Sequence, residues 1–127
     1  MTGDDGAPHL PQQALIEAYG KGGFRFAGMS HRGSLICLPS GIWGWPVVKS
    51  SQIDEAALAR VFAAGGDLGT FLLGTGRDPW IMPETIRTSF RRLGIALEVA
   101  TTGAAVRTYN ILVAERRRVG AGLIAVD

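Results

Sequence analysis

The sequence predicts an α/β fold, in which an N-terminal antiparallel β meander is joined to an α-β-α-β-α-β half to give one mixed sheet flanked by helices. The first half of the chain consists of short segments with strand character, punctuated by glycine-rich turns. The second half alternates amphipathic stretches with short apolar runs that end near glycines. Strands joined through single helices run parallel with right-handed crossovers, so the second half is expected to supply the parallel strands.

The first half begins with a tail and continues as the meander. Residues 1–13 are acidic and rich in proline and glycine, and we expect a flexible tail there, followed by a single domain over residues 14–127. Turns at residues 20–23 and 30–33 separate the strands that follow. Pro46 favours an edge strand, because proline cannot donate a hydrogen bond to a neighbouring strand. The expected strands are Leu15–Tyr19, Phe24–Phe26, Leu35–Leu38 and Ile42–Val48.

The second half is expected to contain three helices and three strands. Asp54 can cap the first helix, whose apolar stripe includes Leu58 and Val61. The apolar run at residues 70–73 ends in glycine, as a strand buried on both faces would. The helices are expected from Asp54 to Gly65, from Pro83 to Gly94 and from Gly103 to about Arg117, and the strands over Thr70–Leu73, Ile95–Val99 and Gly122–Val126.

Composition and charge exclude several classes of function. The 127 residues carry 13 basic and 11 acidic side chains, and a net charge of +2 without a concentrated basic face excludes nucleic acid as a partner. The single cysteine cannot form an internal disulfide. No apolar run approaches the ~18–20 residues of a membrane span, and the N-terminus resembles neither a signal peptide nor a mitochondrial presequence. We therefore expect a cytoplasmic protein of a bacterium or archaeon.

The sequence contains no arrangement of residues typical of catalysis or metal binding. Cys37 lies in an apolar strand without a neighbouring cation, which favours a buried thiol over a nucleophile. His9 lies in the tail and His31 in a polar turn, and together with one cysteine they make no metal-ligand spacing. The acidic residues are scattered, so none is placed as a general acid or base. The sequence therefore predicts no catalytic residue, no metal, no cofactor and no enzymatic activity.

The strongest candidate for a ligand site lies where the parallel strands end. Two loops of small residues are expected to emerge side by side at the carboxyl edge of the sheet, where open α/β sheets bind ligands at helix N-termini. A Rossmann glycine pattern is ruled out, since Pro79 stands where the third glycine should be, and no P-loop triplet occurs. The candidate pocket residues are Gly74, Thr75, Gly76, Thr101, Thr102, Gly103 and Arg107.

A simpler interpretation of the same loops needs no ligand. Thr101 or Thr102 would cap the third helix, and the glycines would permit a tight turn. We favour this interpretation, because capping requires nothing beyond what the sequence contains.

Three tryptophans offer a candidate partner-binding surface. Trp43 and Trp45 are two residues apart and therefore point to the same side of a strand. Burial in the core is the default for tryptophan in a small domain, whereas an exposed tryptophan is a candidate anchor for a partner. Trp80 lies in the loop beyond Gly76, where an exposed aromatic ring would enlarge the candidate surface.

Several motifs together resemble one known family. LLGTG is followed by a proline-containing loop, a helix and the stretch GIALEVATTGAAVRTYNILVAERRRVGAGLIAV, with a tryptophan upstream after a strand pair. Over residues 14–127 the chain resembles a family of small α/β domains of unknown function in archaea and bacteria, which includes the mitochondrial NADH:ubiquinone oxidoreductase (complex I) assembly factor, third of its series. The most specific motifs are Gly74-Thr75-Gly76, Thr102 with Ala105, Arg107-Thr108-Tyr109-Asn110, and Glu115 with Arg117.

The resemblance implies a compact domain with a mixed sheet and no established catalytic activity. It also implies protein partners, because the mitochondrial members act as chaperone-like adaptors during assembly of a membrane-bound respiratory complex. In the family pattern Tyr109 and Asn110 recur with the glycine loop, which fits either a shared polar pocket or a buried hydrogen-bond network that locks helix to sheet.

Two hypotheses about function follow from the residues and the resemblance. The first is a non-enzymatic binding or assembly-factor protein for membrane or respiratory complexes. The second is a domain that binds a small molecule or an anion in a pocket at the carboxyl edge of the parallel strands. This hypothesis includes the case in which the domain is a cryptic enzyme.

Overall fold

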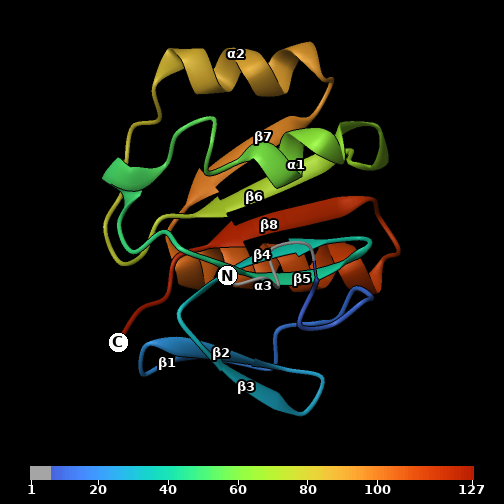
Figure 1. Ribbon diagram of the computed structural model, residues 1–127, viewed down its shortest axis with the longest axis vertical. Coiled ribbons are helices and arrows are strands. Elements are labelled where there is room, and N and C mark those ends of the chain that lie inside the picture. Colours follow the sequence, from blue (N-terminus) through green and yellow to red (C-terminus); the bar gives the residue numbers. More distant parts are fainter. Residues whose placement is uncertain (1–6) are drawn as a thin grey trace.

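The computed structural model describes residues 7–127, which fold into two sheets and three α-helices (Figure 1). The small sheet contains β1 (Ala18–Gly20), β2 (Gly23–Phe26) and β3 (Met29–Arg32). The large sheet contains β4 (Ser34–Leu38), β5 (Gly41–Trp45), β6 (Thr70–Gly74), β7 (Ala96–Ala100) and β8 (Val119–Leu123). The helices are α1 (Ala59–Ala63), α2 (Glu84–Arg92) and α3 (Thr102–Ala114), with 3-10 turns at Ser50–Gln52 and Gly65–Asp67.

The large sheet is mixed, and its strands lie in the order β5-β4-β8-β6-β7. β6 runs parallel to both β7 and β8, while β4 runs antiparallel to β8 and β5. The predicted fold class is therefore confirmed, and so is the parallel pairing of the strands that precede the two candidate loops, with Gly74 opposite Ala100. β5 is an edge strand, as Pro46 directly after it indicates.

Helices cover both faces of the large sheet, because alternate residues of its strands point to opposite sides. Phe71 and Leu73 of β6 pack with α1 and α2 in one apolar cluster, where Phe71 stacks on Phe90 with ring centroids 5.3 Å apart. Leu72, between them, packs with Val106 and the rest of α3 in the other cluster. Figure 1 shows α3 behind the sheet and α1 in front of it.

The meander divides into two parts rather than staying in one sheet. β1, β2 and β3 form a separate antiparallel sheet, seen below the large sheet in Figure 1, whose Phe24 and Phe26 are buried in the cluster around α3. The expectation of a turn at residues 30–33 is wrong, because β3 occupies Met29–Arg32. The turn lies earlier, at Ala27 and Gly28, which both have positive φ and so close a tight hairpin.

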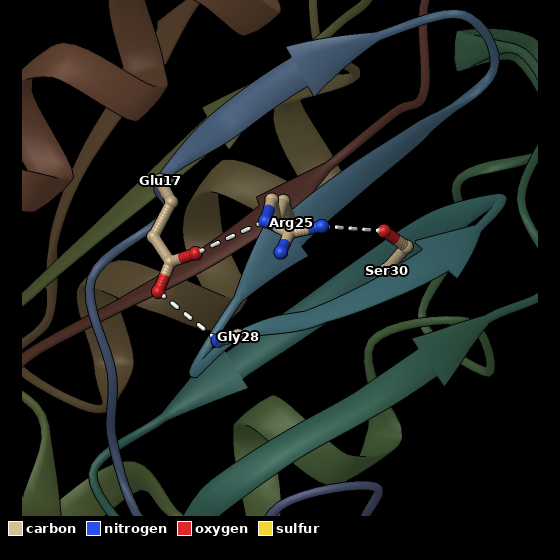
Figure 2. A network of polar contacts seen from close by, with 4 residues as sticks. All are labelled: Glu17, Arg25, Gly28 and Ser30. Atoms are coloured by element: carbon tan, nitrogen blue, oxygen red, sulfur yellow. Dashed lines mark hydrogen bonds and ion pairs between the residues drawn. The ribbon is translucent and has the colours of Figure 1, made fainter.

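The outer face of the small sheet carries a short polar network (Figure 2). Nε of Arg25 lies 3.5 Å from a carboxylate oxygen of Glu17, and its Nη1 donates to the hydroxyl of Ser30 at 3.2 Å. The other carboxylate oxygen of Glu17 accepts the backbone N–H of Gly28 at 3.1 Å. These groups are exposed, so the network fixes the hairpin locally and adds little to global stability.

Further element boundaries differ from those expected. β1 begins at Ala18, three residues after the expected start at Leu15, and β5 ends at Trp45, three residues before the expected end at Val48. α3 ends at Ala114, three residues before Arg117.

Asp54 accepts the N–H of Ala57 at 2.8 Å, yet it caps a run of turns, and α1 begins only at Ala59. The last strand is β8, three residues earlier than the expected Gly122–Val126. A Cβ on Gly120 would stand 3.0 Å from the carbonyl oxygen of Cys37, so the crowded centre of the sheet requires glycines that weaken the strand pattern in the sequence.

Part of the segment expected as a tail contacts the sheet. Residues 1–6 lie outside the described residues. The backbone N–H of His9 donates to the carbonyl oxygen of Ile42 at 2.8 Å. The N–H of Ile42 in turn donates to the carbonyl oxygen of Leu10 at 2.9 Å. Gln13 donates through Nε2 to the carbonyl of Val119 at 2.8 Å. The chain before β1 is thereby held along β5 and beside β8.

Candidate functional site

Gly74, at the end of β6, lets the sheet and α3 approach closely. A Cβ added at this position would stand 2.9 Å from Cα of Thr102 and 3.2 Å from Cβ of Ala105. Both of these atoms belong to the first turns of α3 and cannot move without moving the helix. The first glycine of the loop therefore has a packing role that is independent of any ligand.

Thr102 ties the two candidate loops together through its hydroxyl group. The side chain is fully buried, and its Oγ1 accepts the N–H of Gly76 at 2.9 Å and donates to the carbonyl oxygen of Ile124 at 2.7 Å. Its own N–H donates to the carbonyl of Gly76 at 2.9 Å. The residue at the N-cap of α3 is Thr101, whose side chain makes no capping hydrogen bond. The expectation that one of these threonines caps the helix is wrong, because the Thr102 hydroxyl bonds to the neighbouring strand ends instead.

Thr75 is held within its own loop and lines a hollow. Its Oγ1 donates to the carbonyl of Asp78 at 2.8 Å and lies 3.2 Å from that of Ala100. With Gly76 it borders a hollow of about 520 Å³, which Lys49 and Trp80 also line. The polar groups of this loop are thus largely engaged by the protein itself.

Arg107 and Gly103 line a different hollow, of about 400 Å³, between α3 and β1. The ring of Tyr19 covers the start of the helix, since a Cβ on Gly103 would stand 3.1 Å from its Cζ. Arg107 is exposed, and Asn110 lines the same hollow. The fold therefore brings the candidate residues to neighbouring parts of one sheet edge but places the glycine loop and Arg107 in separate hollows.

Tyr109 and Asn110 hold the segment before β1 against α3. The hydroxyl of Tyr109 donates to the carbonyl of Ala14 at 2.9 Å. Nδ2 of Asn110 donates to the carbonyl of Ile16 at 2.8 Å, and its Oδ1 accepts the N–H of Ile16 at 2.9 Å. Of the two interpretations of these residues, the geometry matches a hydrogen-bond network, and these three bonds join the helix to the backbone of residues 14–16.

Replacing Asn110 with alanine is expected to lower the free energy of unfolding by about 1–3 kcal/mol, because the N–H and C=O of Ile16 lose their partners. Urea unfolding measures the loss, and hydrogen exchange at the Ile16 amide reports whether it is local. Arg107→Ala, on the same helix and exposed, is the matched control and should change stability by less than about 0.5 kcal/mol. Equal losses in both variants would contradict the assigned role of Asn110.

The three tryptophans differ in their surroundings. Trp45 is buried and donates through Nε1 to the carbonyl of Ala57 at 2.8 Å, so it belongs to the core and not to a docking surface. Trp43 is half-buried, with the guanidinium carbon of Arg60 4.5 Å from its ring centroid. Trp80 is half-buried against the cluster around α1 and α2.

The most exposed apolar side chains near these tryptophans are ones that sequence reasoning missed. Ile81 is 91% exposed and follows Trp80 directly, and Val48 is 75% exposed and lines the same hollow as Trp80. Both occur in loops close to a proline, where hydrophobic periodicity carries no information about burial. An apolar residue near a proline in a loop is the signal that could have singled them out.

The thiol and imidazole side chains, of the types that act as nucleophiles or metal ligands, are those of Cys37, His9 and His31. Burial raises the pKa of the Cys37 thiol to about 12, opposed by a hydrogen bond with Tyr109, so the thiol stays protonated at neutral pH. Burial also raises the pKa of Tyr109 far above its ordinary value. The expectation that His31 lies in a polar turn is wrong, because it belongs to β3. Its ring centroid lies 4.8 Å from that of His9. Residues 7–127 contain no group of three side chains that would hold a metal ion.

Known proteins similar to this chain come from bacteria and from animals. A Rhodopseudomonas palustris protein of known solution structure is 52% identical, with a TM-score of 0.83, over 99% of this chain and 93% of that one. The crystal structure of an outer membrane protein from Bartonella henselae is 44% identical, with a TM-score of 0.90, over 94% of this chain and all of that one. Among residues 7–127, no helix has the length and apolar character needed to cross a bilayer.

The resemblance seen in the sequence motifs is confirmed by these relatives. Mouse NADH dehydrogenase (ubiquinone) 1 alpha subcomplex assembly factor 3 is 30% identical over 115 residues, which are 91% of this chain and 62% of the mouse protein. The chain thus spans less than two thirds of this relative. Residues 16–124 match the family described as protein of unknown function (DUF498/DUF598). Because this match covers most of the chain, the protein belongs to the DUF498/DUF598 family.

Proposed function

We propose that the protein is a non-enzymatic, chaperone-like adaptor that binds protein partners during assembly of membrane or respiratory complexes. The name of the mouse relative, an assembly factor of the NADH dehydrogenase, supports this role. The engaged polar groups around Thr75 and Thr102 also favour binding over chemistry, because they leave few groups to meet a substrate.

The observation that carries the proposal is the exposure of Ile81. Burying an isoleucine side chain is worth about 1.5–3 kcal/mol, and at 91% exposure Ile81 leaves nearly all of this free energy for a partner. Trp80 precedes it directly, and Val48 lines the same hollow as Trp80, together with Lys49 and Arg77. An apolar centre with a polar rim is the usual anatomy of a transient protein interface. We call Val48, Trp80 and Ile81 the docking face.

Affinity capture with an Ile81→Asp variant tests the docking face. The N-terminally tagged protein is recovered from detergent-solubilised membranes of its own organism, and the captured proteins are quantified by mass spectrometry. We expect the original protein to enrich respiratory-complex subunits over an untagged control. The Ile81→Asp variant should recover them at least about tenfold less, because a charge in the apolar centre of an interface opposes docking.

The matched control is Ile111→Asp. Ile111 is 54% exposed on α3, and the same charge is added there away from the docking face. This variant should capture the same subunits as the original protein. Absence of respiratory subunits from every capture would contradict the adaptor role, and equal loss in both variants would contradict the docking face.

The proposal includes a cytoplasmic location, where the adaptor meets newly made subunits before or during their insertion. Fractionation of the native cells into cytoplasm, inner membrane and outer membrane tests this part. The protein is expected in the cytoplasmic fraction and, when partners are present, at the inner membrane. Recovery in the outer membrane, as the name of the Bartonella relative would suggest, would contradict it.

A further inference from the structure

We infer that His9 and His31 together form a site for one divalent transition-metal ion of the kind that prefers imidazole, such as Zn²⁺. The two side chains come from different parts of the fold. His9 belongs to the N-terminal segment that bonds to β5, and His31 lies in β3 of the small sheet. The contact between them joins the N-terminal segment to the small sheet.

The nitrogens of the two rings converge on one point. Gly44 of β5 has no side chain, and the position that its Cβ would take lies 3.2 Å from Nε2 of His9 and 3.7 Å from Nε2 of His31. Both nitrogens therefore border the same small space above the backbone of β5. Gly44 is exposed, so an ion can reach this space from solvent.

The separation of the rings fits shared coordination. Zinc lies ~2.0–2.1 Å from a histidine nitrogen, which places it roughly 3.2 Å from the ring centroid, and two rings at a near-tetrahedral angle then have centroids about 5 Å apart. The observed separation is 4.8 Å, with the ring planes inclined at 49°. The observed separation is therefore close to the one that a shared ion requires.

The surrounding backbone holds both ligands in place. The backbone N–H of His9 donates to Ile42 at 2.8 Å, and His31 pairs with Phe24 in the small sheet. Two protein ligands leave further positions open for water or for a side chain of a partner.

The sequence makes the test specific, because it contains two histidines in all. Untagged protein is titrated with Zn²⁺ by isothermal calorimetry at neutral pH, and compared with His9→Gln and His31→Gln. We expect one ion per chain and a loss of affinity of at least about tenfold in each variant, since each removes a ligand. Two independent sites, of which each variant removes one, would overturn the shared site, and so would absence of binding to the original protein.

A third variant tests convergence while both imidazoles remain. In Gly44→Ala the new methyl group would occupy the space between the two Nε2 atoms, and we expect Zn²⁺ binding to weaken although the fold is retained by circular dichroism. Unchanged affinity in Gly44→Ala would overturn the inference. This variant also covers the case in which His31→Gln fails to fold.

Discussion

The Gly74→Ala variant is expected to have a free energy of unfolding about 3 kcal/mol lower than that of the original protein. This loss is at the upper end of the usual cost of overpacking. The new methyl group would stand 2.9 Å from Cα of Thr102 and 3.2 Å from Cβ of Ala105. The nearest atom is backbone, so relief requires α3 to move away from β6, and this movement would disturb the packing of Val106 and Tyr109 on the sheet. Urea unfolding followed by circular dichroism measures the loss.

Gly66→Ala provides the control for the glycine-to-alanine change itself. Gly66 lies in the 3-10 turn after α1, its φ is not positive, and a Cβ there would meet nothing within 4 Å. We expect this variant to match the original protein or to exceed its stability slightly, because alanine restricts the unfolded chain. A Gly74→Ala variant as stable as Gly66→Ala would show that the close approach of β6 and α3 is not required.

The Thr102→Val variant is expected to lose about 2–6 kcal/mol of unfolding free energy, because two buried groups each lose a partner worth about 1–3 kcal/mol. The N–H of Gly76 loses its acceptor and the carbonyl of Ile124 loses its donor, while the shape of the side chain is nearly preserved. Hydrogen exchange should show the Gly76 amide exchanging faster than in the original protein.

The neighbouring threonine supplies the control for this change. Thr101 stands at the N-cap without a side-chain capping bond, so Thr101→Val makes the same chemical change one residue earlier without breaking a capping hydrogen bond. We expect its stability to stay within about 0.5 kcal/mol of the original. If Thr101→Val were the more damaging variant, the hydroxyl of Thr102 would not be the link between the loops.

Much of the fold could be predicted from the sequence, because its elements carry local signals. The apolar run at residues 70–73 and the amphipathic stretch after Pro83 match β6 and α2 closely. Prediction failed where neighbours in space decide the structure. The glycines of β8 make it a poor strand by pattern, and they are needed because Cys37, Phe71 and Trp45 crowd the centre of the sheet.

The candidate site was predictable in its place but not in its contacts. Topology alone brings the loops after β6 and β7 to one edge. The sequence does not determine that the hydroxyl of Thr102 points to Gly76 and Ile124, or that Asn110 binds the backbone of Ile16, because those partners are 26, 22 and 94 residues away. The contact of His9 with His31 was missed for the same reason, since it depends on how the small sheet docks on β5.

The position of β8 affects how the protein folds during synthesis. β8 is the last strand along the chain, yet it lies between β4 and β6 and pairs with both. Until residues 119–123 leave the ribosome, the β4–β5 hairpin and the β6–β7 pair have no common strand to join them. Each then presents an unpaired edge that can associate with other chains. The growing chain therefore completes its sheet in a late step, and nascent protein stalled before that step exposes both unpaired edges.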